Sequence, residues 1–172
     1  MKAVVFTEYG PPEVLRVTEV AKPIPKNKEV LIRIRATSLN FGDFIVRNFK
    51  AVTPAEFHMP LLFWFIGRVT FGFYRPRVRI LGSEFAGEVA AVGKAVTLFK
   101  KGDRVFGYRG PAMGAYAEYL RMPENGVLAA MPSNLGFAEA AAVPYGALMA
   151  LSLLRRIDLQ PGQKIPSPAG LA

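Results

Sequence analysis

Glycine and proline interrupt this chain so often that most of its elements must be short: 16 glycines and 14 prolines occur among 172 residues. Between these breaks, apolar and polar residues tend to alternate, which is the pattern of a half-buried β-strand. The clearest case is residues 29–36, where Ile32 and Ile34 alternate with Arg33 and Arg35. The pattern predicts a mainly β protein, built as a barrel or a sandwich.

Other segments complete this expected order of elements. Strands are expected over residues 2–7, 14–20, 84–92, 104–107, 115–122 and 126–131. Apolar residues at helical spacing predict helices over residues 41–49, 61–74 and 137–156. Pro144 lies inside the last of these and predicts a kink. Gly93 and Gly102 stand where turns need positive φ.

The charge of the chain is strongly positive, with a formal net charge of +9. Most basic residues are dispersed, but Arg75, Arg77 and Arg79 form a cluster just after Arg68. Two interpretations stay open: a solvated basic face, or a docking patch for an anionic substrate, a phosphate or a partner domain. No nucleic-acid motif accompanies the charge, so we expect no nucleic-acid partner.

Two further features bear on the compartment. The chain has no cysteine, which excludes disulfides, thiolate zinc sites and a cysteine nucleophile, and fits a cytoplasmic location. Glu8 comes too early for the apolar core of a secretory signal. The apolar stretch 61–74 is interrupted by Arg68 and is shorter than the roughly 20 residues of a bilayer span. We therefore expect no transmembrane helix and no membrane partner.

Several segments, in order and spacing, resemble the medium-chain dehydrogenase/reductase superfamily. They are Met1-Lys2-Ala3-Val4-Val5, Gly10-Pro11-Pro12-Glu13-Val14-Leu15, Leu81-Gly82-Ser83-Glu84-Phe85-Ala86-Gly87-Glu88-Val89, Gly102-Asp103-Arg104-Val105, Gly114-Ala115-Tyr116-Ala117-Glu118-Tyr119 and Ala140-Ala141-Ala142-Val143-Pro144. The resemblance implies a GroES-like, partly open β-barrel with peripheral helices over residues 1–135, and a junction helix over 136–164. In that superfamily a Rossmann domain follows and binds the nicotinamide cofactor.

The tail, residues 165–172, does not fit the first strand of a Rossmann domain. Pro166 and Pro168 cannot sit in a central parallel strand, and no glycine fingerprint follows them. We expect the Rossmann domain to be missing from this chain. The chain alone is then expected not to bind NADPH tightly.

The resemblance also predicts that no zinc is bound. The superfamily's cysteine and histidine ligands fall at Asn40 and Ser83, neither of which binds zinc as a thiolate or imidazole does, and Glu84 alone cannot make a site. His58 is the only histidine and is expected to be a loop or surface residue. These departures indicate the zinc-free branch, similar to quinone oxidoreductases that use NADPH.

In that branch, the resemblance implies catalytic roles for Asn40, Asp43 and Tyr108. Asn40 would offer its amide at the former metal position, Asp43 would orient its neighbours, and Tyr108 would donate a proton. The alternatives are that Asn40 and Asp43 only cap a helix, and that Tyr108 is simply packed or exposed.

The same resemblance implies that the cofactor is approached by Tyr145, Gly146 and Met149. A threonine is common in the superfamily where Met149 stands, so one contact of the cofactor is lost there.

The expected function is the substrate-binding half of a zinc-independent, NADPH-dependent oxidoreductase that reduces a quinone, an enone or an aldehyde or ketone. The alternatives are a non-catalytic GroES-like binding or assembly module, and a truncated product without function. The aromatic insert 63–73 is either a lid for an apolar substrate, part of a core, or an interface between protomers. A homodimer is thus one expectation for the assembly.

Overall fold

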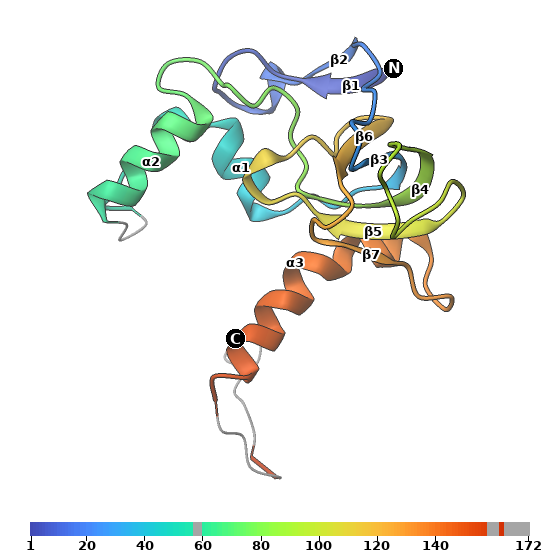
Figure 1. The fold of residues 1–172 in the computed structure, drawn as a ribbon. Helices are drawn as coiled ribbons and strands as arrows, with labels where there is room; N and C mark the ends of the chain where they lie inside the picture. The colour runs from blue at the N-terminus through green and yellow to red at the C-terminus, as the bar shows by residue number, and fades with distance from the viewer. Residues whose placement is uncertain (57–59, 158–161, 164–172) are drawn as a thin grey trace.

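The computed structural model describes residues 1–56, 60–157 and 162–163. Its main body is an antiparallel sheet of five strands in the order β6-β3-β4-β5-β7 (Figure 1). The longest strands, β3 and β4, lie at the middle of this order and pair along most of their length. The strand bounds are β3 Glu29–Ala36, β4 Glu84–Val92, β5 Arg104–Tyr108, β6 Tyr119–Pro123 and β7 Leu128–Ala130.

A separate two-stranded ribbon, β1 (Lys2–Val5) with β2 (Arg16–Glu19), lies over one end of this body. Single bridges from Ala3 to Ala117 and from Val5 to Ile80 attach it. Among the described residues, the outer strands β6 and β7 do not pair with each other, so the sheet is open and not a closed barrel. The prediction of a mainly β fold is confirmed.

Three apolar clusters fill the interior. The largest lies within the sheet and includes Ile32, Phe85 and Val105, which are fully buried. A second joins Phe6 of the ribbon region to Val46 of α1. Alternation holds in the second half of β3, where Arg33 and Arg35 are exposed and Ile34 is half-buried, as the sequence pattern predicts. In the first half, residues 30–32 are all buried.

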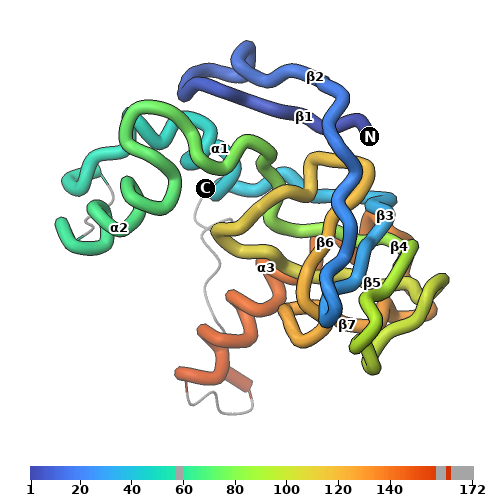
Figure 2. The backbone as a smooth tube through the Cα atoms, turned by 45° about the horizontal axis from the view of Figure 1, so that its top comes forward, coloured from blue at the N-terminus to red at the C-terminus, as the bar shows by residue number. Residues whose placement is uncertain are grey.

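The three helices lie where the sequence places them, with shorter ends. Their bounds are α1 Phe41–Arg47, α2 Leu61–Phe71 and α3 Phe137–Leu154. Figures 1 and 2 show α1 and α2 on one side of the molecule, with α2 at its edge, while α3 extends away from the sheet near β5 and β7. The start of α3 packs on the sheet through Ala140, Ala141 and Pro144.

The second half of α3 is exposed and apolar, including Leu148, Leu151 and Leu153. By length and composition alone, this is the one helix among the described residues that could cross a bilayer. The same exposure suits a helix whose apolar face packs on another protein surface. The expectation that no membrane span exists therefore stays a prediction.

Local turns explain where element boundaries shift. The strand expected from residue 14 begins at Arg16, because Pro12–Val14 form a 3-10 turn. The strand expected over 115–122 begins at Tyr119, since the residues before it approach the ribbon instead. Gly102 has φ 94°, as predicted for a turn. The prediction for Gly93 is wrong: its φ is not positive, and a Cβ there would lie 1.9 Å from the Lys26 carbonyl oxygen.

Candidate functional site

The first residue of β4, Glu84, lies at the centre of a buried polar cluster. Only 3% of it is exposed, and its carboxylate accepts three hydrogen bonds from two separate segments. The Ser38 hydroxyl and the Asn40 amide nitrogen donate to Oε2, the latter at 3.2 Å. The backbone N–H of Tyr145 donates to Oε1 at 2.7 Å. One carboxylate therefore joins the connection between β3 and α1 to the helix α3.

Asn40 precedes α1 as its N-cap, but its side chain does not cap the helix. Its Nδ2 atom donates to Ser83 Oγ at 2.7 Å and to Glu84 Oε2. The carboxylate next to it requires the nitrogen, not the oxygen, on this side. Both amide hydrogens are thus used within the chain, so capping is not the whole role of Asn40.

The cap is provided by Asp43, which is 2% exposed. Its Oδ2 accepts the Asn40 backbone N–H at 3.1 Å and the Tyr116 hydroxyl at 2.9 Å, and its Oδ1 accepts the Gly82 N–H at 2.9 Å. Burial, followed by the charge of Asp43 and this hydrogen bond, raises the pKa of Tyr116. Asp43 therefore fixes the positions of α1, the loop before β4 and Tyr116 relative to one another.

Tyr108 reaches the same cluster from the neighbouring strand. It is the register partner of Glu84 in the β4–β5 pair, so the two side chains share one face of the sheet. Its ring lies 5.9 Å from that of Tyr145, measured between centroids. Burial first, and then Tyr145, Glu84 and Asp43, raise the pKa of Tyr108. The phenol consequently stays protonated at neutral pH.

On α3, Pro144 explains how Tyr145 meets Glu84. A proline inside a helix disrupts the local hydrogen-bond ladder, and here the next N–H points to a carboxylate instead. Tyr145, Gly146 and Met149 are exposed on this helix. A Cβ added at Gly146 would meet no atom within 4 Å, so packing within the described residues does not require glycine there.

The structure thus brings together Asn40, Asp43, Tyr108 and Tyr145, whereas no contact joins Gly146 or Met149 to the cluster among the described residues. Sequence reasoning missed Glu84 as the organising residue. The signal for it was an acidic residue at the start of an otherwise apolar strand. His58 lies outside the described residues. The described part of the chain contains no group of three potential metal ligands.

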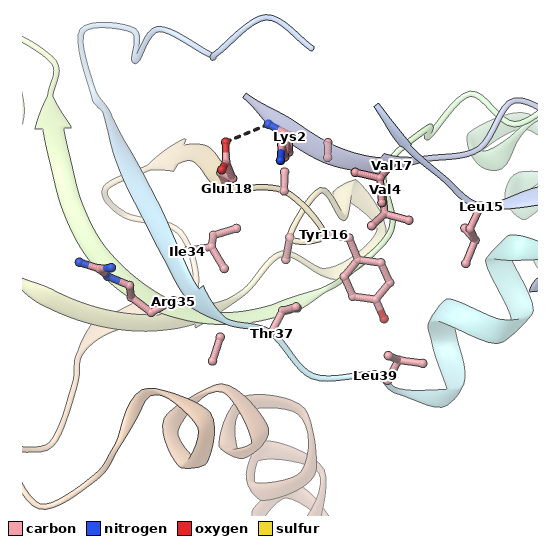
Figure 3. Close-up of a pocket in the computed structure, with 14 residues that line it drawn as sticks. Lys2, Val4, Leu15, Val17, Ile34, Arg35, Thr37, Leu39, Tyr116 and Glu118 are labelled. Carbon is pink, nitrogen blue, oxygen red and sulfur yellow. Dashed lines mark hydrogen bonds between the residues drawn. The ribbon is translucent and has the colours of Figure 1, made fainter. Parts of the chain in front are cut away.

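A separate hollow of about 670 Å³ lies between the β1–β2 ribbon, the end of β3 and residues 115–118 (Figure 3). Its lining is mostly apolar, with Val4, Val17 and Leu39 among the residues drawn. Tyr116 forms part of its wall while its hydroxyl binds Asp43. Its size suits a small ligand, but none of the predicted site residues line it. The predicted site residues gather at Glu84 instead.

Comparison with known proteins gives consistent relatives. Residues 26–133 match the family described as the alcohol dehydrogenase GroES-like domain. A quinone oxidoreductase of Pseudomonas aeruginosa is 37% identical over 165 residues, covering 95% of this chain and 44% of that protein. A 2-methylene-furan-3-one reductase of Solanum lycopersicum is 34% identical over 175 residues, covering 96% of this chain and 39% of that protein.

Solved structures of oxidoreductases are also similar to this chain. The quinone oxidoreductase of Escherichia coli, solved in complex with NADPH, superposes with a TM-score of 0.75 at 27% identity, covering 95% of this chain and 43% of that one. An NAD-dependent alcohol dehydrogenase superposes with a TM-score of 0.74 at 33% identity, covering 94% of this chain and 49% of that one. The chain spans less than half the length of these relatives.

Proposed function

The chain belongs to the alcohol dehydrogenase GroES-like domain family of the medium-chain dehydrogenases/reductases, and on this premise we propose that it forms the substrate-binding part of a zinc-independent, NADPH-dependent oxidoreductase. The substrate class is a quinone, an enone, or an aldehyde or ketone. The observation that carries the proposal is the cluster around Glu84, which places the Tyr108 phenol beside the exposed Tyr145 in the middle of α3.

Tyr108 is the proton donor of this proposal. Among the described residues, its hydroxyl makes no hydrogen bond, unlike those of Tyr116 and Ser38, which are both engaged. A substrate oxygen that gains negative charge during reduction needs such a donor. The raised pKa keeps the Tyr108 hydroxyl protonated, as an ordinary tyrosine also is at neutral pH, so it can donate a hydrogen bond to that oxygen.

Asn40 and Asp43 act here as positioning residues. Both hydrogens of the Asn40 amide bind Ser83 and Glu84, and Asp43 accepts three hydrogen bonds, so neither has a free group of the kind that Tyr108 offers. Their task is to fix Glu84 and the start of α1. A fixed wall beside the substrate preserves the geometry that hydride transfer requires.

The residues for the cofactor are Tyr145, Gly146 and Met149. Their exposure, and the empty space above Gly146, fit the approach of a flat ring to α3. When bound, a nicotinamide cofactor would supply the hydride. Tyr145 would help to hold that group, and its ring lies beside that of Tyr108.

Zinc independence is supported by the side chains that stand where the superfamily has its zinc ligands. Asn40 and Ser83 are hydrogen-bonded to each other at 2.7 Å, and Glu84 already accepts three hydrogen bonds. Zinc prefers thiolate, imidazole and free carboxylate ligands, and this set offers neither of the first two.

One experiment tests the function. The chain is joined to the part of Escherichia coli quinone oxidoreductase that lies beyond the matched region, and NADPH consumption is followed with a quinone. We expect turnover that a zinc chelator does not change, and a kcat lowered about 100-fold in Tyr108→Phe. Tyr119→Phe, on another strand, is the matched control. A fusion that binds NADPH but reduces no quinone or enone would contradict the proposal.

A further inference from the structure

The helix α2 contacts the rest of the molecule through one narrow face. The residues of this face are spaced as neighbours on a helix: Trp64, Gly67, Arg68 and Phe71. The Phe71 ring lies 5.1 Å from that of Phe49, and a Cβ at Gly67 would lie 2.8 Å from the same ring. This contact fixes which side of α2 faces outward.

The outward side is apolar, which reverses the usual arrangement of a surface helix. Leu62 is 66% exposed, Phe65 53% and Ile66 49%. Phe73 and Tyr74 extend this surface beyond the helix, and Tyr74 is 85% exposed. Contiguous apolar surface of this kind marks an interaction site.

A run of positive charges without acidic neighbours in sequence follows α2, and its Arg77 lies on the helix, where it donates to the Val69 carbonyl oxygen at 2.7 Å. Arg75, Arg77 and Arg79 are all exposed, and residues 57–83 contain no aspartate or glutamate. In the part of the chain that the structure describes, the ion pairs are Arg35–Glu88 and Arg121–Glu29, so none of these three arginines is paired. The surface thus combines apolar area with unneutralised positive charge.

We propose that α2 and the arginine segment 75–79 together bind the surface of an anionic phospholipid membrane. Eleven residues at about 1.5 Å each give about 16 Å, roughly half of the hydrocarbon thickness, so α2 can lie in the interface but cannot span it. The arginines then meet the anionic headgroups. This departs from the expectation of no membrane partner, which considered only a span.

The charge beside α2 supports a membrane over a second copy of the chain as the partner. Figures 1 and 2 show α2 at the edge of the molecule, away from the five-stranded sheet. In a two-fold dimer the same patch meets itself, and residues 57–83 of the second copy contain no aspartate or glutamate to pair with these arginines. An anionic lipid surface complements both the apolar side chains and the charges.

Co-sedimentation of the chain with vesicles tests the proposal. We expect binding to phosphatidylcholine vesicles that contain phosphatidylglycerol, much weaker binding to phosphatidylcholine alone, and release at high salt. The triple variant Leu62→Gln, Phe65→Gln, Ile66→Gln should bind at least about ten-fold more weakly. Arg75→Gln with Arg79→Gln should lower partitioning roughly five-fold per arginine.

Two matched controls separate this surface from others. Leu153→Gln with Leu154→Gln changes the exposed apolar face of α3, and Lys100→Gln with Lys101→Gln removes two exposed charges between β4 and β5. Neither pair should change vesicle binding. No binding to anionic vesicles, or equal loss in the α3 variant, overturns the proposal. So does a dimer, seen by sedimentation equilibrium, that the triple variant abolishes.

Discussion

At the scale of single residues, Glu84 connects two segments that lie far apart in the sequence, residues 38–40 and the helix α3. Both of its carboxylate oxygens accept hydrogen bonds, so a glutamine in its place must turn an NH₂ group toward at least one donor. The side chain is buried, so water cannot compensate for that mismatch.

Glu84→Gln is therefore expected to lower the free energy of unfolding by about 1–3 kcal/mol. Urea denaturation measures this. Glu88→Gln on the same strand is the control, because Glu88 pairs with Arg35 at the surface and such pairs contribute about 0–1 kcal/mol. Equal effects of the two variants would contradict the central place of Glu84.

Tyr116 gives a prediction with a pH dependence. Its pKa is raised in the folded chain above the ordinary value of 10.0. The stabilisation is thus complete below pH 10 and is lost as the pH rises through the folded pKa. Tyr116→Phe leaves Asp43 one donor short and should cost about 1.5–3 kcal/mol at neutral pH.

The same variant should also lose less stability than the parent chain between neutral pH and pH values above about 10. Denaturation curves at several pH values measure both effects, with Tyr119→Phe as the control. A parent chain and variant that lose stability in parallel over this range would contradict the assignment of the raised pKa to Tyr116.

At this scale, sequence reasoning identified the residue types but not all of their partners. Asn40, Asp43 and Tyr108 were predicted as neighbours of one site, and the structure places them around Glu84. That Asp43 and not Asn40 supplies the capping side chain could not be predicted, because both residue types cap helices. The choice depends on Ser83 and Glu84, which are about 40 residues away along the chain.

At the scale of elements, two glycines show opposite constraints. Gly146 lies inside α3 with open space around it, whereas Gly93 lies against the backbone of residues 26 and 27. Gly146→Ala should raise the free energy of unfolding by about 0.5–1 kcal/mol, because alanine favours the helix. Gly93→Ala should lower it by about 1–3 kcal/mol through overpacking.

Urea denaturation of the two glycine variants side by side measures both shifts. Changes of the same sign would show that one of these surroundings is described wrongly.

The strand and helix order was predictable from periodicity, since β4 has the expected bounds and all three helices were expected. The reason for glycine at residue 93 was not predictable, because a close approach between distant segments leaves no local signal.

At the scale of the whole molecule, the cluster at Glu84 is bordered by the open sheet and by α3, whose second half is exposed. The polar groups there are fixed by hydrogen bonds within the chain, whereas the Tyr108 hydroxyl makes no hydrogen bond among the described residues. This arrangement suits recognition of a substrate oxygen without a metal ion. We propose that this oxygen binds at Tyr108, which is held beside Glu84.

The most direct test is a titration of the ¹⁵N-labelled chain with a small water-soluble enone, followed by NMR. We predict saturable shifts of the backbone signals of Ser83, Glu84, Tyr108 and Tyr145, and affinity roughly two- to ten-fold weaker in Tyr108→Phe, with Tyr119→Phe unchanged. Shifts confined to the hollow beside Tyr116, or an affinity that Tyr108→Phe leaves intact, would contradict the account.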